Sequence, residues 1–209
     1  MTTDTSTPPG LRESKKQETR QAISDHATRL FVEQGFEATT ISEIAAAARV
    51  AKKTVTNYFA RKEDLALDHQ DAFAASLARV VSGRAPGESA PAALRRAFAA
   101  AVEARDPVAG FAPEPFARMI ADSPTLTAAL RVLHDRREAE LARALADATG
   151  AAPDDITVLT TATLLGGVHR VLFQRIQDHI LAGRSADETA RLVAADAARA
   201  FDLVEPALA

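Results

Sequence analysis

Apolar residues recur along this chain at the spacing of one face of an α-helix, in blocks separated by turn residues. In the first block, Ile23, Ala27 and Phe31 fall at i, i+4 and i+8. Gly35 follows this block, and glycine commonly ends helices because it adopts the left-handed conformation at little cost. The pattern predicts a first helix over residues 14–34.

Two short helices are predicted after Gly35. The run TISE at 40–43 is a capping box, in which the Thr hydroxyl and the Glu carboxylate satisfy two backbone donors at a helix start, and Ile44 continues the apolar face. After a tight connection at 50–51, Val55 and Phe59 lie one turn apart and can pack inward. Three helices, of which two are short and joined by a turn, describe a helix-turn-helix unit.

The remainder of the chain also has helical periodicity, so the predicted fold class is all-α. Ser123 suits an N-cap and Pro124 the first helical position that follows it. The predicted helices cover residues 64–81, 91–104, a short segment ending near residue 122, 124–149, 153–181 and 185–204. Residues 1–13 are polar with a Pro-Pro-Gly break and are predicted to form a disordered arm. The predicted domains are therefore a helix-turn-helix domain at 14–62 and a second helical domain at 63–209.

Composition narrows the class of protein. The chain has 209 residues, of which 47% are hydrophobic and 25% charged, which is enough for a sizeable core. It has no cysteine, which excludes disulfides, thiolate zinc sites and a thiol nucleophile. No run approaches the roughly 18 consecutive apolar residues of a membrane helix, and no signal peptide is recognisable. We therefore expect a cytoplasmic protein without a membrane partner.

Charge is distributed unevenly. Residues 1–62 carry ten Lys or Arg against seven acids, whereas the rest carries 15 basic and 21 acidic residues. All five lysines lie in the first part, four of them between residues 15 and 53. A basic head on an acidic body is typical of a protein that presents one end to a polyanion, although chance scatter gives similar totals.

The run AISDHATRLFVEQGFEATTISEIAAAARVAKKTVTNYFARKEDL resembles the DNA-binding domain of the TetR family of bacterial transcriptional regulators. The match covers about residues 20–66. The positions that fall at the family's spacing are Gly35, Phe36, Thr40, Ile41, Ile44, Ala45, Val50, Thr54, Val55, Tyr58, Phe59, Lys62, Glu63 and Leu65. The resemblance implies an N-terminal three-helix DNA-binding domain, followed by a helical effector-binding and dimerisation domain.

The resemblance also implies which residues meet double-stranded DNA. Thr40, Tyr58 and Lys62 would hold the phosphate backbone. The residues that would face the major groove are Lys52, Lys53, Thr54, Thr56 and Asn57. Their chemistry agrees with this role, since Lys pairs with guanine acceptors or phosphate and Asn with adenine. The alternative is that Tyr58 belongs to the core and the lysines solvate a helix face; for Phe59 the core interpretation is favoured.

Three positions depart from the family pattern. Ala51 replaces a usual Ser, Thr56 a usual Tyr, and Arg61 a usual Ser or Asn. Two of these are helix N-cap positions, where losing a cap typically costs about 1 kcal/mol. Arg61 is expected to exchange a capping role for an extra phosphate contact.

In the second domain, the resemblance implies a small-molecule effector and a homodimer. Apolar and polar residues of the central helices are the ligand-binding candidates: Phe98, Phe116, Met119, His134, Leu164, His169 and Phe173. The dimer is expected through the last two helices, where Ala162, Gly166 and Gly167 keep one face flat. Ordinary packing within the chain is the alternative for each of these residues.

No catalytic constellation is recognisable, so we expect no enzyme, no cofactor and no metal site. The histidine and aspartate neighbours are Asp25-His26, Asp68-His69, His134-Asp135 and Asp178-His179. On a helix, such neighbours point about 100° apart and do not face each other. These features favour a ligand-responsive DNA-binding regulator, by family default a repressor released from a near-palindromic operator. The rival hypothesis is a helical small-molecule-binding or scaffold protein without DNA binding.

Overall fold

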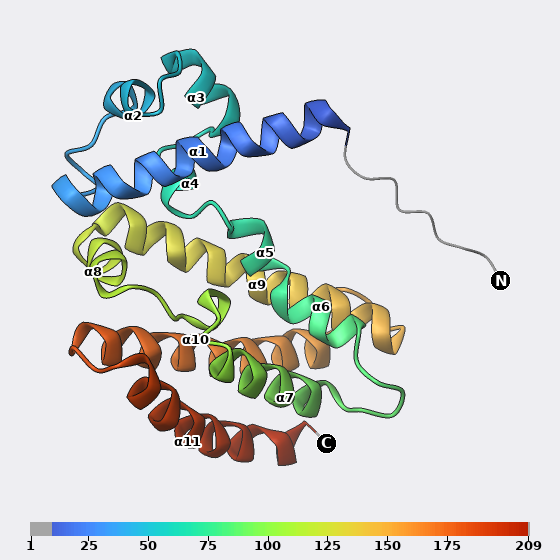
Figure 1. The fold of residues 1–209 in the computed structure, drawn as a ribbon. Coiled ribbons are helices and arrows are strands. Elements are labelled where there is room, and N and C mark those ends of the chain that lie inside the picture. Colours follow the sequence, from blue (N-terminus) through green and yellow to red (C-terminus); the bar gives the residue numbers. More distant parts are fainter. Residues whose placement is uncertain (1–9, 209) are drawn as a thin grey trace. The chain divides into compact units, whose positions relative to one another are not determined.

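The computed structural model of the protein describes residues 10–208, and helices make up all the regular secondary structure there (Figure 1). The elements are α1 (Leu11–Gln34), α2 (Ile41–Ala47), α3 (Lys52–Tyr58), α4 (Glu63–Ala66), α5 (Gln70–Ala74), α6 (Ser76–Ser82), α7 (Ala90–Glu103), η1 (Pro107–Ala109), α8 (Glu114–Asp122), α9 (Pro124–Thr149), α10 (Ile156–Leu181), α11 (Ala186–Val204) and η2 (Glu205–Ala207), where η marks a 3-10 helix. The predicted all-α class is confirmed.

The expected disordered arm at 1–13 falls mainly outside the described residues. Residues 1–9 are not described, whereas α1 already begins at Leu11. The last residues of the expected arm are therefore helical. Gly10 precedes α1 without a side-chain cap, and its carbonyl accepts from the backbone N–H of Glu13 and of Ser14.

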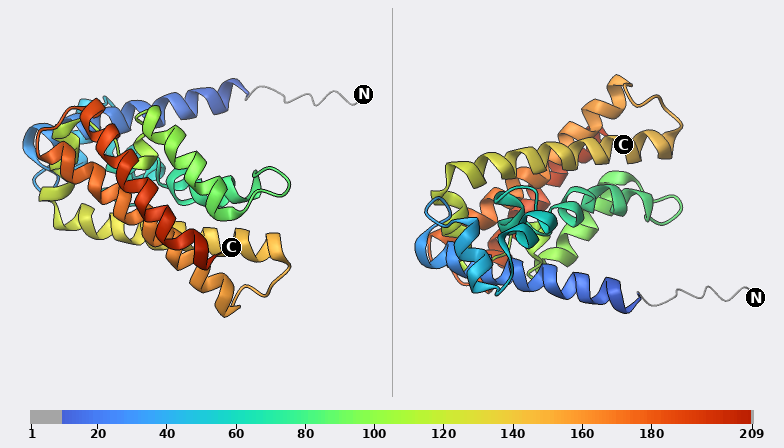
Figure 2. Two further views of the ribbon diagram at one scale, coloured as in Figure 1. Left: turned by 90° about the horizontal axis from the view of Figure 1, so that it is seen from below. Right: turned by 90° about the horizontal axis from the view of Figure 1, so that it is seen from above.

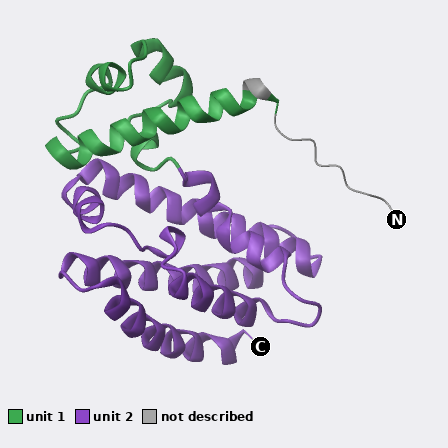
Figure 3. Cartoon of the chain, in the orientation of Figure 1, with its two compact units in different colours: residues 1–68 green, residues 69–209 purple. Residues whose placement is uncertain are grey.

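The chain divides into two compact units, residues 1–68 and 69–209 (Figure 3). We predicted the boundary after residue 62, and the structure places it after Asp68. Short helix α4 belongs to the first unit because Leu65 is fully buried there. The Ser24 hydroxyl of α1 reinforces this attachment, since it lies 3.1 Å from the Leu65 carbonyl oxygen and 2.6 Å from a carboxylate oxygen of Asp68.

The first unit is built around the face of α1 that the apolar periodicity predicted. Ile23, Ala27 and Phe31 are all fully buried, as is Val55 from α3. The capping box at the start of α2 is formed as predicted, and α3 begins at Lys52 without a side-chain cap. Unit 1 thus contains the expected three helices with α4 added.

The helix predicted over residues 64–81 is wrong, because three short helices occupy this stretch. The backbone leaves the helical conformation at Leu67 (φ −110°, ψ 46°) and α5 ends at Ala74. The Ser76 hydroxyl donates a hydrogen bond of 2.7 Å to the Phe73 carbonyl. Such side-chain bonds compete with the helical ladder, which explains a bend where neither Gly nor Pro is present.

Side-chain caps fix the starts of the larger helices in the second unit. The residues that cap α7, α9, α10 and α11 are Ser89, Ser123, Asp155 and Ser185. The predicted start at Ser123-Pro124 is confirmed. Helix α10 begins at Ile156, a little later than expected, because the Asp155 carboxylate accepts from the backbone N–H of Thr157 and of Val158.

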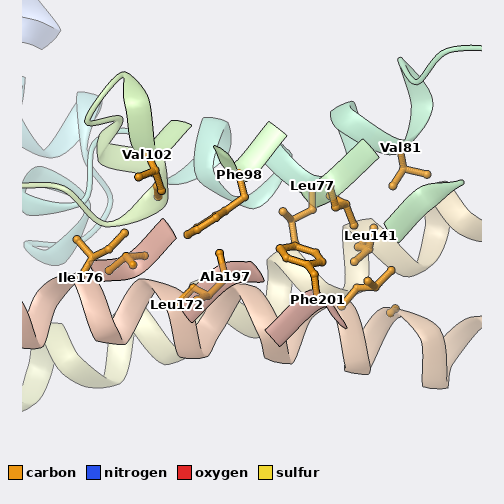
Figure 4. Packing of buried hydrophobic residues seen from close by; sticks show 14 of the residues in the cluster. Leu77, Val81, Phe98, Val102, Leu141, Leu172, Ile176, Ala197 and Phe201 are labelled. Carbon is orange, nitrogen blue, oxygen red and sulfur yellow. The ribbon is translucent and has the colours of Figure 1, made fainter. Parts of the chain in front are cut away.

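The core of the second unit lies between α6, α7, α9, α10 and α11. Helices α9 and α10 contact each other extensively, and Figure 2 shows the loop at 150–155 that joins them. Figure 4 shows Phe98 of α7 and Phe201 of α11 among the packed side chains of this core. Leu165, Leu172 and Ile176 of α10 are at most 1% exposed.

Helix α10 is also the one helix among the described residues that is long and apolar enough to cross a membrane by length and composition. Its inner face is buried against α9 and α11, as expected for a core helix of a bundle. Charged Arg175 and Asp178 lie on its exposed side. We therefore assign α10 to the protein core.

Candidate nucleic-acid interface and ligand site

Helix α3 has a buried side and an exposed polar side. Val55 and, directly after the helix, Phe59 are buried, at 0% and 3% exposure. Four of the residues predicted to face DNA are exposed together on the other side: Lys52, Lys53, Thr56 and Asn57. Thr54 and Tyr58 are half-buried at the margin between the two sides. The structure thus brings together the residues expected in a groove-facing surface.

The two lysines of α3 are the free positive charges of this surface. No ion pair among the described residues involves Lys52 or Lys53. The hydroxyl of the exposed Thr56 donates to the Lys53 carbonyl at 3.1 Å, so its oxygen can still accept a further hydrogen bond. Exposed ammonium groups beside an amide and a hydroxyl match the phosphate and base edges of duplex DNA.

Arg20 of α1 supports α3 from behind, and sequence reasoning missed this residue. Its Nη1 donates to the Tyr58 carbonyl at 2.9 Å, and its guanidinium carbon lies 4.3 Å from the centroid of the Phe59 ring. A signal was available, since Arg20 precedes Ser24, Ala27 and Phe31 at helical spacing on the buried face of α1. The bond satisfies a carbonyl at the end of α3, where helices leave such groups unpaired.

Thr40 caps α2 and is exposed. Its hydroxyl lies 2.7 Å from the Glu43 carboxylate, and its backbone N–H donates to the same carboxylate at 2.7 Å. These bonds lower the pKa of Glu43 below its ordinary value, since they favour the charged form. The predicted phosphate contact of Thr40 therefore starts from a hydroxyl that is already part of the capping box.

Arg61 and Lys62 make contacts within unit 1. Arg61 pairs with Asp64 at 3.3 Å, and the Asp64 carboxylate also accepts from the Arg61 backbone N–H at 2.9 Å. The Lys62 ammonium lies 2.8 Å, 3.3 Å and 3.1 Å from the carbonyl oxygens of Phe36, Glu37 and Thr39. Three carbonyls match the three donors of an ammonium. This geometry gives Lys62 a structural role, and its phosphate contact stays a prediction.

The candidate ligand residues separate into two aromatic groups in unit 2. In the first, His134 and Phe173 lie 5.1 Å apart between ring centroids, and each packs edge-on against Phe73. In the second, His169 lies 5.5 Å from Phe98 and 5.7 Å from Phe201. Sequence reasoning missed Phe73 and Phe201 as ring partners of the two histidines.

The remaining ligand candidates lie elsewhere. Met119 is buried and Phe116 half-buried on α8. Leu164 is 39% exposed on the outer side of α10, away from the buried aromatic groups, and its ligand-binding role stays a prediction. Its neighbour Leu165, one residue and about 100° further round the helix, is the one that points into the core.

Burial keeps both histidines neutral at neutral pH. It lowers the pKa of His134 to about 4, with smaller contributions from Arg137 and Arg170. It also lowers the pKa of His169 well below the ordinary value, again helped by Arg137. The Nε2 atom of His169 is buried without a hydrogen-bond partner among the described residues.

Arg137 of α9 is a buried charged residue that sequence reasoning missed. It is 5% exposed, and burial lowers its pKa to about 10. Its position falls one turn after Leu133 and one turn before Leu141, on the apolar stripe of α9. The sequence around it, DRRE at 135–138, is rich in charge and therefore predicts an exposed segment.

The dimer residues suggested by the sequence lie mostly inside the chain. Ala162 is 1% exposed, and a Cβ atom on Gly166 would lie 3.2 Å from the Glu138 side chain. The outer face of α10 instead exposes Ile156, Leu159 and Val171, at 75%, 41% and 59%. No group of three or more His, Cys, Asp or Glu side chains suited to a metal occurs within residues 10–208.

The fold and the α3 surface define a helix-turn-helix DNA-binding protein, and comparison with known proteins gives its family. The sequence profile of the bacterial regulatory proteins of the tetR family matches residues 23–68. TcmR, an HTH-type transcriptional regulator of Streptomyces glaucescens, is 33% identical over 152 residues, which cover 70% of this chain and 67% of TcmR. The chain belongs to the TetR family and is a DNA-binding transcriptional regulator.

Solved structures share the fold over nearly the whole chain. A TetR-family regulator from Streptomyces coelicolor is 24% identical, with a TM-score of 0.52 over 93% of this chain and 98% of its own. NalD of Pseudomonas aeruginosa, the secondary repressor of the MexAB-OprM multidrug efflux pump, is 17% identical, with a TM-score of 0.54 over 90% and 97%. Members of the family are in general soluble, non-enzymatic DNA-binding proteins that bind effectors and typically dimerise.

Proposed function

We propose that this protein is a homodimeric cytoplasmic repressor, without enzymatic activity or cofactor, that leaves a near-palindromic operator when a small molecule binds in unit 2. The observation that carries this proposal is the exposed polar face of α3. Lys53 and Asn57 are exposed there, whereas Val55 on the opposite face is buried. In a dimer, two such helices roughly 34–36 Å apart would enter successive major grooves. An effector that prefers a form with another spacing would shift the population off DNA by no more than its differential affinity.

Base reading and backbone holding are separable by substitution. Asn57→Ala should change the preference among DNA sequences, because an amide pairs with a base edge. Lys53→Ala should weaken binding to all sequences or to guanine-containing ones, and lower the dependence of affinity on salt. Equal, sequence-blind losses in both variants would contradict the assignment of Asn57.

The deciding experiment is selection of duplex fragments from a random library by the purified protein, followed by alignment of the enriched sequences. An inverted repeat supports a dimeric regulator and supplies the operator for all later assays. No enrichment at low salt would favour the rival hypothesis, a helical small-molecule-binding or scaffold protein.

The proposed dimer uses the outer faces of α10 and α11. Exposed apolar side chains lie on both helices, with Leu203 of α11 80% exposed. A groove of about 570 Å³ lies at the N-terminal end of α10, and Leu164, Ala207 and Leu208 are among its lining residues. Exposed apolar side chains gathered around a groove are typical of subunit interfaces.

Charge placed on this face should separate the subunits. Val171→Arg should convert the dimer to a monomer in analytical ultracentrifugation, because a charge would face the apolar partner surface. Val132→Arg is the matched control, since Val132 is 62% exposed on α9, outside the proposed interface. A dimer that survives Val171→Arg and is lost in Val132→Arg would move the interface to α9.

A further inference from the structure

Arg137 places an uncompensated positive charge inside the aromatic part of unit 2. Its side chain is 5% exposed. Its Nε donates to the Ser76 hydroxyl at 2.8 Å, and its guanidinium carbon lies 4.5 Å from the centroid of the Phe73 ring. No carboxylate lies within ion-pair distance of it among the described residues. Buried charges in proteins are ordinarily paired, so this guanidinium requires an explanation.

The acidic residues beside Arg137 in the sequence, and the one that acts on it electrostatically, are engaged elsewhere. Asp135 pairs with Arg170 at 2.9 Å. Glu138 accepts from the Thr163 hydroxyl at 2.7 Å and lies 3.7 Å from Arg170. Asp106 attracts the Arg137 charge from a greater distance, but its carboxylate accepts from the Val108 backbone N–H. None of the three acids neutralises Arg137 directly.

Hydrogen bonds orient the guanidinium. The Ser76 hydroxyl that accepts from Nε also donates to the Phe73 carbonyl, so the Nε edge is held in a chain of two bonds. The Nη1 and Nη2 atoms have no protein acceptor among the described residues. Two parallel N–H donors on one planar edge match the two oxygens of a carboxylate.

The surroundings of Arg137 are rings and neutral imidazoles. Phe73, Phe173 and His134 pack edge-on against one another, with centroids 5.1–5.8 Å apart. Both His134 and His169 are close enough to be affected electrostatically by Arg137. This environment combines one cation, two neutral hydrogen-bonding groups and aromatic walls.

We infer that the molecule that regulates this protein is an organic acid, whose anionic oxygens pair with Arg137 and whose ring-bearing apolar body packs against Phe73 and Phe173. The inference rests on the proposed ligand-responsive function and names the chemical class of its ligand. His134 and His169 would orient polar atoms of the same molecule. A cationic ligand is excluded from this position by the guanidinium.

The first test compares acids with their uncharged amides on the wild-type protein. The probes are benzoate, 1-naphthoate and biphenyl-4-carboxylate, each with its carboxamide, and binding is measured by isothermal titration calorimetry. We expect at least one acid to bind about tenfold more tightly than its amide, since a hydrogen bond to a charged group is the stronger one. The inference is overturned if every amide binds as tightly as its acid, or if no acid binds at millimolar concentration.

The second test assigns the preference to one side chain. Arg137→Gln should abolish the tenfold preference for the acid, and Arg137→Lys should retain part of it, because Lys keeps the charge without the planar fork. Arg136→Gln is the matched control, since Arg136 is exposed and pairs with Asp71 at 2.9 Å. A preference that persists in Arg137→Gln, checked by circular dichroism to be folded, would overturn the assignment.

A third measurement separates this inference from the proposed function. Fluorescence anisotropy on the selected operator duplex is recorded with and without the acid that binds best. If that acid releases DNA from the wild type and not from Arg137→Gln, the result supports both the ligand class and the proposed ligand-responsive function. Arg137-dependent binding of the acid with no effect on DNA would sustain the ligand class and contradict the proposed ligand-responsive repression.

Discussion

Replacing Lys62 by Met tests whether this residue stabilises the DNA-binding unit. The substitution keeps the aliphatic stem and removes the ammonium that lies 2.8–3.3 Å from three carbonyl oxygens. It also removes a cation–π contact, since Nζ lies 4.3 Å from the centroid of the Phe36 ring. The carbonyls of Phe36 and Thr39 belong to buried residues, so they would lose a partner that water replaces poorly.

The expected loss of stability is about 2–4 kcal/mol. A hydrogen bond to a charged group contributes about 1.5–3 kcal/mol, and a partly exposed cation–π contact about 0.5–1 kcal/mol. The three bonds share one ammonium and are not additive, and the carbonyl of exposed Glu37 can be hydrated instead. We therefore count the three bonds as one charged hydrogen bond and add the cation–π contact, which gives the expected loss of about 2–4 kcal/mol.

Native-state hydrogen exchange, followed by mass spectrometry on the full chain, measures this loss where it should occur. Peptides covering residues 35–66 should exchange faster in Lys62→Met, whereas those from unit 2 should not change. Lys53→Met is the control, because Lys53 is exposed and surface substitutions usually change stability by less than about 0.5 kcal/mol. A variant with unchanged exchange and weakened operator binding would refute the structural role and place Lys62 on the DNA backbone.

Three further substitutions test other parts of the structure. Replacing His134 by Gln tests the pKa of this imidazole, which is lowered from 6.5 to about 4. The unfolded state therefore binds the proton first, and the free energy of unfolding should fall by on the order of 3 kcal/mol as the pH drops from 6.5 to below 4. Urea unfolding of His134→Gln should show a smaller pH dependence than that of the wild type. Gly110→Ala should lower the melting temperature strongly, since φ is 121° and a Cβ would lie 3.1 Å from the Phe173 carbonyl oxygen. Gly87→Ala is the control: its φ is 81° but its Cβ would meet open space, so the melting temperature should fall less. Thr40→Ala should destabilise α2 by about 1 kcal/mol through loss of its cap, as faster exchange at residues 40–47 would report.

Local patterns were sufficient to predict most of the fold. The periodicity of Ile23, Ala27 and Phe31 identified the buried face of α1, and the TISE run identified the start of α2, because both depend on residues within a few turns. The break between α5 and α6 was not predictable in this way. Ala75 is a good helix former, and the bend there involves the Ser76 hydroxyl and its partner Arg137, which is remote in sequence.

The candidate sites show the same limit. Helix α3 could be oriented because Val55 within it and Phe59 directly after it are large apolar residues that pack inward, so the polar face had to point outward. Helix α10 carries apolar residues on both sides, and periodicity alone does not distinguish inward Leu165 from outward Leu164. The assignment of such a helix needs the positions of its neighbours, which only the folded chain provides.

The hydrogen bonds from Arg137 to Ser76 and from Ser76 to Phe73 determine where unit 2 can be joined to the DNA-binding unit of another regulator. A foreign DNA-binding unit joined at residues 68/69 would leave α5 and α6 of this protein intact, and with them the Ser76 hydroxyl that accepts from the guanidinium and the Phe73 carbonyl that accepts from Ser76. A junction placed after Ser82 would remove the Ser76 hydroxyl and the Phe73 ring, and would strand a buried cation on α9. Modules of this protein should therefore be exchanged before α5, so that the ligand domain keeps the short helices which complete its interior.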